Sequence, residues 1–121
     1  MPPEPTAVPP DDELRLQHML DAALAAQRFV EGRRRADLDS DEMLLRALTH
    51  CFMEIGEAAA RITETTRAMI PELPWGQIVH VRHIVVHVYW GIDRDRLWRS
   101  IDEDLPPLIL AVDKVVAKWR R

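Results

Sequence analysis

The chain of 121 residues has few of the residues that several protein classes require. Cys51 is the only cysteine, so an intrachain disulfide is impossible and the reducing cytoplasm is the expected location. Four glycines, four tryptophans, two phenylalanines and one tyrosine are too few for a small β-sandwich or barrel, which needs many turns. No run approaches the roughly 20 apolar residues of a membrane span, and the N-terminus does not resemble a signal peptide. We therefore expect no membrane partner.

Excess positive charge is also missing. Sixteen Lys and Arg face twenty Asp and Glu, for a formal net charge of −4 at pH 7. A nucleic-acid contact would therefore depend on a local basic patch or on a second copy of the chain. The remaining composition, 47% hydrophobic and 30% charged, is typical of one soluble globular domain.

Proline divides the chain into two parts. Residues 1–10 contain five prolines and are predicted to be a disordered leader. Residues 11–121 form the predicted domain. Its first helix is expected to begin near Asp11 or Asp12 as N-cap and to fade at Gly32, before a solvated run of three arginines.

The later helices are predicted from caps and prolines. Asp39 and Glu42 have the spacing of a capping box, for a helix expected to reach about Arg67. Asp93 is expected to cap a short helix. Pro106 and Pro107 are tolerated only in a first turn, which places the start of the last helix at residues 104–106.

The segment of residues 78–90 has conflicting signals. Seven of its thirteen residues are Ile or Val, which favours a strand. No other segment of the chain is predicted to be a strand, and an isolated strand is marginal in water. We therefore predict a helix here and an all-α, up-and-down bundle of four main helices plus a short one.

This same segment carries the candidate chemistry. Three residues are catalytic candidates: Arg82 provides a fixed charge for phosphate oxygens, and His87 a proton donor or acceptor near pH 7. Tyr89 provides a hydroxyl that can donate to a phosphate oxygen or accept a modification. On an ideal helix Arg82 and Tyr89 lie within roughly 20° of each other, whereas His87 lies roughly 140° around from Arg82. One straight helix does not easily direct all three at one phosphate. A working site is therefore expected to need a loosened helix or a second copy across a two-fold axis.

Two other interpretations of this segment stay open from the residues alone. His80, His83 and His87 have the i, i+3, i+7 spacing of metal ligands on one helical face, although no cysteine lies near them. Alternatively, the histidines and Arg82 are structural and pair with Glu54, Glu57 or backbone groups in the core.

The order of several motifs resembles one known family. Residues 53–59 (MEIGEAA), residues 70–75 (IPELPW), and Arg82-x-x-x-x-His87-x-Tyr89 followed by Ile92-Asp93 are similar to the HepT-like toxin family of the HEPN superfamily. Trp98 and residues 103–106 (EDLP) also match its pattern. The resemblance covers about residues 14–118.

The resemblance implies a dimeric helical bundle that brings two Arg-x-x-x-x-His motifs together. It implies a metal-independent ribonuclease toxin of a type VII toxin–antitoxin pair, without a cofactor, in which Arg82 and His87 are catalytic. The implied antitoxin is an MntA-type minimal nucleotidyltransferase that transfers AMP to Tyr89, where a bulky anion would repel RNA.

One residue departs from the family pattern. The position after the motif arginine is usually Asn and is His83 here, which cannot be both donor and acceptor in one tautomer. His83 is therefore only a supporting candidate. An alternative function follows from this departure and from the acidic net charge, namely a non-catalytic helical partner that presents a nucleotide or substrate to a nucleotidyltransferase.

Overall fold

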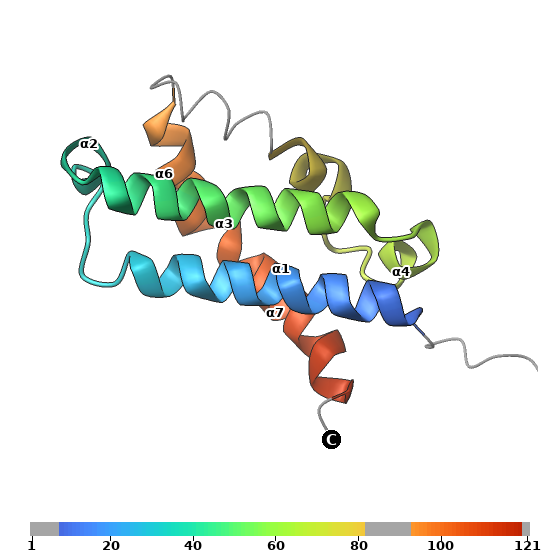
Figure 1. The fold of residues 1–121 in the computed structure, drawn as a ribbon. Coiled ribbons are helices and arrows are strands. Elements are labelled where there is room, and N and C mark those ends of the chain that lie inside the picture. Colours follow the sequence, from blue (N-terminus) through green and yellow to red (C-terminus); the bar gives the residue numbers. More distant parts are fainter. Residues whose placement is uncertain (1–7, 82–92, 120–121) are drawn as a thin grey trace, which may run out of the picture.

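The computed structural model describes residues 8–81 and 93–119, and these residues form helices and no strand (Figure 1). In chain order the helices are α1 (Pro10–Phe29), α2 (Asp37–Ser40), α3 (Glu42–Arg61), α4 (Glu64–Met69), a helix that includes residues 75–81, α6 (Arg94–Glu103), α7 (Leu105–Val116) and the 3-10 turn η1 (Ala117–Trp119). The predicted all-α class is confirmed. In the same described ranges, no helix is both long enough and apolar enough to cross a bilayer.

Two long antiparallel helices, α1 and α3, form the main layer of the fold. They lie side by side along their length, and α7 crosses behind α1 and packs against it (Figure 1). Small residues line the contact: Ala23, Ala26 and Ala59 are completely buried. Short side chains allow the two helix backbones to approach closely, so α1 and α3 form a rigid base for the remaining helices.

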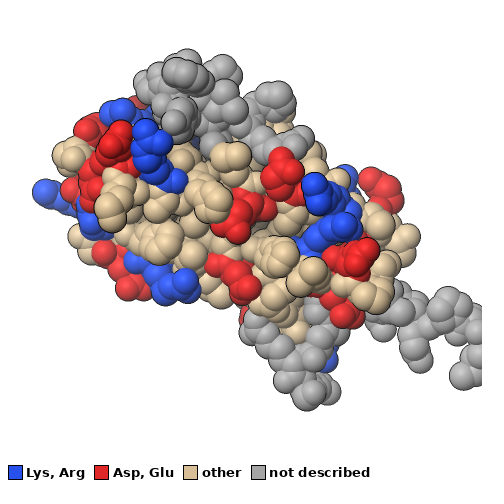
Figure 2. Space-filling view, in the orientation of Figure 1, with Lys and Arg blue, Asp and Glu red and all other residues tan. Residues whose placement is uncertain are grey.

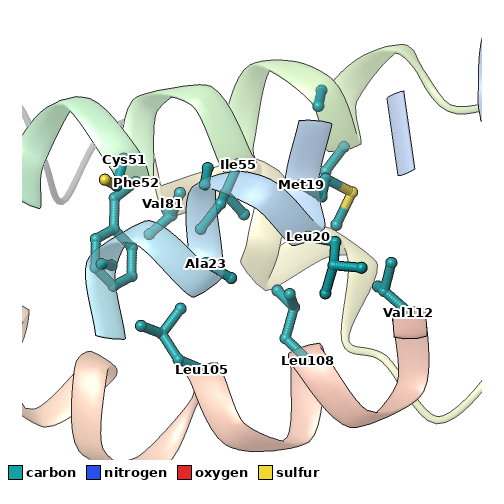
Figure 3. Packing of buried hydrophobic residues seen from close by; sticks show 14 of the residues in the cluster. Met19, Leu20, Ala23, Cys51, Phe52, Ile55, Val81, Leu105, Leu108 and Val112 are labelled. Atoms are coloured by element: carbon teal, nitrogen blue, oxygen red, sulfur yellow. The ribbon is translucent and has the colours of Figure 1, made fainter. Parts of the chain in front are cut away.

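The core lies between α1, α3 and α7, as Figure 3 shows. Leu16, Leu20 and Leu48 have no exposed surface. Leu105 and Leu108 of α7 point toward the α1–α3 layer in Figure 3. Each fully buried leucine stabilises the fold by roughly 1.5–3 kcal/mol relative to an exposed one. The apolar residues that recur every three or four positions, such as Leu16 and Leu20 in α1 and Leu48, Phe52 and Ile55 in α3, face this core. Met43, which the same spacing places with them, is instead 81% exposed.

The start of α3 differs from the prediction. Asp41, not Asp39, is the N-cap, and its Oδ1 accepts a hydrogen bond from the backbone N–H of Leu44 at 3.0 Å. The capping box predicted from Asp39 and Glu42 is wrong because Asp39 belongs to α2 and pairs with arginines. Arg33 binds the second oxygen of Asp41 at 2.6 Å, so the predicted solvated arginine run is also wrong in part.

The end of α3 also differs from the prediction. The helix ends at Arg61, and Ile62 follows in an extended conformation with its side chain buried. The chain then starts α4 at Glu64 instead of continuing to Arg67. Burial of Ile62 favours the bend, because a continuous helix would place the next apolar positions beyond the end of α1.

Asp12 is the residue that holds this bend to α1. It was expected to be a possible N-cap of α1, but Pro9 occupies that position. The Asp12 carboxylate is 1% exposed and accepts hydrogen bonds from the hydroxyls of Thr63 and Thr66, both at 2.6 Å, and from the backbone N–H of Thr63 at 3.3 Å. Burial raises the pKa of Asp12, but these hydrogen bonds outweigh it, so the pKa lies below its ordinary 3.8.

Replacing Asp12 is expected to destabilise the protein. Asp12→Ala removes the acceptor of Thr63 and leaves the buried Thr66 hydroxyl unpaired in the core, which costs about 2–3 kcal/mol in the free energy of unfolding. Because the folded pKa is lowered, the contribution of Asp12 is present above pH 3.8 and is lost as the pH falls through the folded pKa. Urea unfolding at pH 7 and at successively lower pH measures both effects. Asp11→Ala, at the exposed neighbouring position, is the control, and an equal loss in both variants would contradict this role.

Candidate functional site

The four candidate site residues, Arg82, His83, His87 and Tyr89, lie outside the described residues. Their arrangement therefore stays a prediction. The structure does describe the residues on both sides of the segment, 75–81 before it and Asp93 after it. These two anchors determine where the segment begins and ends in the fold.

The first anchor is the helix of residues 75–81. It begins after Pro74, whose carbonyl accepts the backbone N–H of Ile78 at 3.0 Å. Val81 is buried in the core, and Ile78 and Val79 are half-buried against it. The helix predicted against the β-propensity of its residues is therefore confirmed for residues 78–81. Packing of the apolar side chains outweighs local propensity here.

Trp75 fixes the direction in which this helix leaves the core. Its indole N–H donates to the carbonyl of Ile70 at 3.0 Å, across the turn that contains Pro71 and Pro74. The Arg67 guanidinium lies 5.7 Å from the Trp75 ring centroid and donates to the carbonyl of Ala59 at 2.9 Å. Arg67 thus connects the end of α3 to the start of the candidate segment, and a cation–π contact of this kind contributes about 0.5–1 kcal/mol.

The second anchor is the N-terminus of α6. Asp93 is its N-cap, as predicted, and Oδ1 of Asp93 accepts the backbone N–H of Arg96 at 3.0 Å. Leu97 and Ile101 of α6 are buried in the core. The segment of residues 82–92 therefore runs from one fixed helix to the cap of another.

Ion pairs connect α6 to α2. Arg94 lies 3.2 Å from Asp39, and Arg35 lies 3.1 Å from Asp39 and 2.5 Å from Asp95. Hydrogen bonds from Arg35 and Arg94 hold the pKa of Asp39 below its ordinary value. Figure 2 shows basic and acidic side chains intermixed at the α2 end of this face. These arginines are occupied by carboxylates, so they do not form a free basic surface.

A cavity of about 130 Å³ lies between the helix of residues 75–81, α3 and the α6–α7 junction. Its apolar wall includes Phe52, Ile55 and Val81, and Figure 3 shows these three side chains together with Leu105. Its polar lining comes from Glu72, Gln77, Arg96, Ser100 and Asp104. Sequence analysis did not predict a cavity here, although Glu72 and Asp104 lie in residues 70–75 and 103–106, the motifs that resemble the family pattern. Ser100 has a weaker signal, because its hydroxyl lies within the apolar spacing of Leu97 and Ile101.

The metal interpretation has no support in the part of the chain that the structure describes. No group of three His, Cys, Asp or Glu residues suitable for a metal ion occurs among those residues. His80 is described and exposed, whereas His83 and His87 are not described, so the three-histidine site itself stays untested. Glu54, a predicted core partner of the motif, is exposed and lies 3.2 Å from Nε2 of His50.

Loss of the α6 cap is expected to weaken the second anchor. Asp93→Ala removes the hydrogen bond to the N–H of Arg96, at a cost of about 1 kcal/mol in the free energy of unfolding. Thermal unfolding measures this loss, and Asp93→Asn should recover most of it because Asn also caps helices. Asp102→Ala, at an exposed position in the same helix, is the control and should be close to neutral. A neutral Asp93→Ala would contradict the capping role.

Comparison with known proteins places the chain in a family. The Ribonuclease HepT-like family profile matches residues 19–115. A candidate ribonuclease of Methanocaldococcus jannaschii is 30% identical over 100 residues, which cover 83% of this chain and 92% of that protein. A candidate ribonuclease of Caldanaerobacter subterraneus subsp. tengcongensis is 27% identical, over 85% of this chain and 92% of that protein.

A third relative carries the family name itself. A candidate ribonuclease HepT of Thermococcus cleftensis is 32% identical over 72 residues, which cover 60% of this chain and 66% of that protein. No solved structure matches the chain significantly. The family profile covers most of the helical domain, from α1 to α7. The chain therefore belongs to the HepT-like ribonuclease family.

Proposed function

We propose that this protein is a metal-independent ribonuclease toxin whose active site combines Arg82 and His87. One observation supports the proposal above all others: the Arg82-x-x-x-x-His87-x-Tyr89 spacing occurs in a chain of the HepT-like ribonuclease family. The two fixed ends of the segment, Val81 and the Asp93 cap, support it further, because a catalytic segment needs rigid support.

The residue types suit cleavage through the RNA 2′-hydroxyl. In this reaction the 2′-oxygen loses a proton and attacks phosphorus, and the 5′-oxygen leaves with a proton, giving a 2′,3′-cyclic phosphate. His87 would accept or donate one of these protons, since imidazole titrates near pH 7. Arg82 would stabilise the added negative charge on the phosphoryl oxygens by bidentate hydrogen bonds.

The site is proposed to form between two protomers. On a straight helix His87 points roughly 140° away from Arg82, so one copy does not direct both groups at the same phosphate. A two-fold axis would bring Arg82 of one protomer near His87 of the other. A dimer would also double the local density of arginines in a chain whose net charge is −4.

Mixing two inactive variants tests the shared site. Arg82→Ala and His87→Ala should each lose RNA cleavage, with or without EDTA. After the two are unfolded and refolded together, about a quarter of wild-type activity should return, because half of the dimers are mixed and each contains one intact site. His18→Ala, an exposed histidine of α1, is the control and should cleave normally. Full activity of His87→Ala would overturn the ribonuclease proposal, and an inactive mixture would overturn the shared site.

Regulation is proposed to act through Tyr89. A cognate MntA-type nucleotidyltransferase antitoxin would transfer AMP from ATP to the Tyr89 hydroxyl, releasing pyrophosphate. The added phosphate would repel RNA and compete for Arg82, which follows from charge alone. Tyr89 is the only tyrosine of the chain, so a tyrosine modification has one possible position.

Co-expression with a nucleotidyltransferase encoded next to this protein tests the modification. Intact mass spectrometry should show an added AMP on the wild-type protein and none on Tyr89→Phe. The modified protein should lose RNA cleavage, and unmodified Tyr89→Phe should stay toxic in the presence of the antitoxin. An AMP on Tyr89→Phe would contradict this position. Co-purification without RNA cleavage by either form would favour the alternative of a non-catalytic partner of the nucleotidyltransferase.

A further inference from the structure

Ser100 of α6 is a buried polar residue with an unused hydroxyl. It is 4% exposed and lines the cavity next to Val81. The other buried polar residues of the described chain all have hydrogen-bond partners: Asp12 with Thr63 and Thr66, and Thr49 with the carbonyl of Arg46. In residues 8–81 and 93–119, no hydrogen bond is made by the Ser100 hydroxyl. The Ser100 hydroxyl is not among the fully buried polar atoms that lack a partner, so it opens to the cavity, where a ligand can pair with it.

Two charged side chains that line the same cavity could also bind a ligand. Asp104 is the N-cap residue of α7, but its carboxylate makes no capping hydrogen bond. Arg96 lies in the first turn of α6 and is half-buried, and its guanidinium forms no ion pair within the described ranges. The other arginines of this end, Arg35 and Arg94, are paired with carboxylates. Arg96 is therefore suited to an anion that comes from outside the chain.

The cavity has the composition of a site for a flat, partly polar ring. Its volume of about 130 Å³ is on the order of ten times the ~10–15 Å³ that one water requires, so it admits more than ordered solvent. Phe52, Ile55 and Leu105 provide apolar walls, while Gln77, Ser100 and Asp104 provide hydrogen-bonding groups. Apolar walls with a few polar groups are typical of small-molecule sites, and single-stranded RNA is recognised by bases held in this way.

The position of the cavity connects it to the proposed site. Val81 lines the cavity and directly precedes Arg82, and consecutive Cα atoms are about 3.8 Å apart. Arg96, on the other side, follows the Asp93 cap by three residues. The cavity thus lies between the two ends of the segment that carries the motif.

We infer that this cavity binds one nucleobase of the single-stranded RNA substrate, with Arg96 beside the adjoining phosphate. The inference rests on the proposed ribonuclease function. Glu72 and Asp104 are acceptors only, so they favour bases with an amino group, namely adenine, cytosine and guanine, over uracil. Ser100 is then a specificity-determining residue, because its hydroxyl pairs with the edge of the bound base.

Nucleotide titration of the full-length protein tests the inference. With AMP, CMP, GMP and UMP as probes, NMR should show shifts at the amides of Gln77 and Ser100, with at least one amino-bearing nucleotide binding several-fold more tightly than UMP. Ser100→Ala should weaken that binding about 2- to 10-fold, the value of one hydrogen bond. Ser40→Ala, on the exposed surface of α2, is the matched control. Ile78→Phe should fill the cavity and abolish binding, with thermal unfolding to verify that the variant folds.

The outcomes separate this inference from the proposed function. Shifts confined to other residues, equal binding of UMP, or unchanged binding by Ser100→Ala would overturn the base site. If the protein cleaves RNA but no nucleotide enters the cavity, the ribonuclease function stands and the base site does not. If nucleotides bind in the cavity but RNA is not cleaved, the base site stands and the ribonuclease function does not.

Discussion

The close packing of α1 on α3 is the constraint on which the rest of the structure depends. Completely buried alanines such as Ala23 and Ala59 allow the two backbones to approach, and the larger side chains then fill the layer toward α7. The candidate segment starts from one side of this layer, after Val81, and ends at α6, which packs against α7. Loss of the α1–α3 contact would therefore move both anchors at once.

Much of the fold could be predicted because apolar spacing directly reflects burial. The stripes of α1, α3 and α7, the Asp93 cap and the start of α7 all follow from local sequence. The boundaries of α3 could not be predicted in this way, because long-range contacts decide them. Arg35 and Arg94 draw Asp39 away from the capping position, and Asp12, some fifty residues away, stabilises the bend after Ile62.

The candidate site likewise has one part that could be predicted from the sequence and one part that could not. The roles of Arg82, His87 and Tyr89 stay a prediction, which rests on their types and spacing together with the family to which the chain belongs. The cavity beside Val81 could not be predicted from local sequence, because its lining comes from segments far apart in the chain, namely α3, residues 72–81, α6 and α7. Ser100 can be recognised as a candidate binding residue only from the structure, which shows that it lines the cavity.

The two anchors of the candidate segment differ in their physical nature, and this has a consequence for solution conditions. Trp75 and Val81 hold one end by burial and by a hydrogen bond to the Ile70 carbonyl, and dissolved ions affect such contacts little. At the other end, partly exposed ion pairs, Arg35–Asp95 and Arg94–Asp39, add to the burial of α6. Counter-ions screen exposed charges over about 8 Å at physiological ionic strength and over about 3 Å at 1 M. Concentrated salt should therefore weaken the contact of α6 with α2, while the buried Leu97 and Ile101 keep α6 in the core and the Trp75 end stays unchanged.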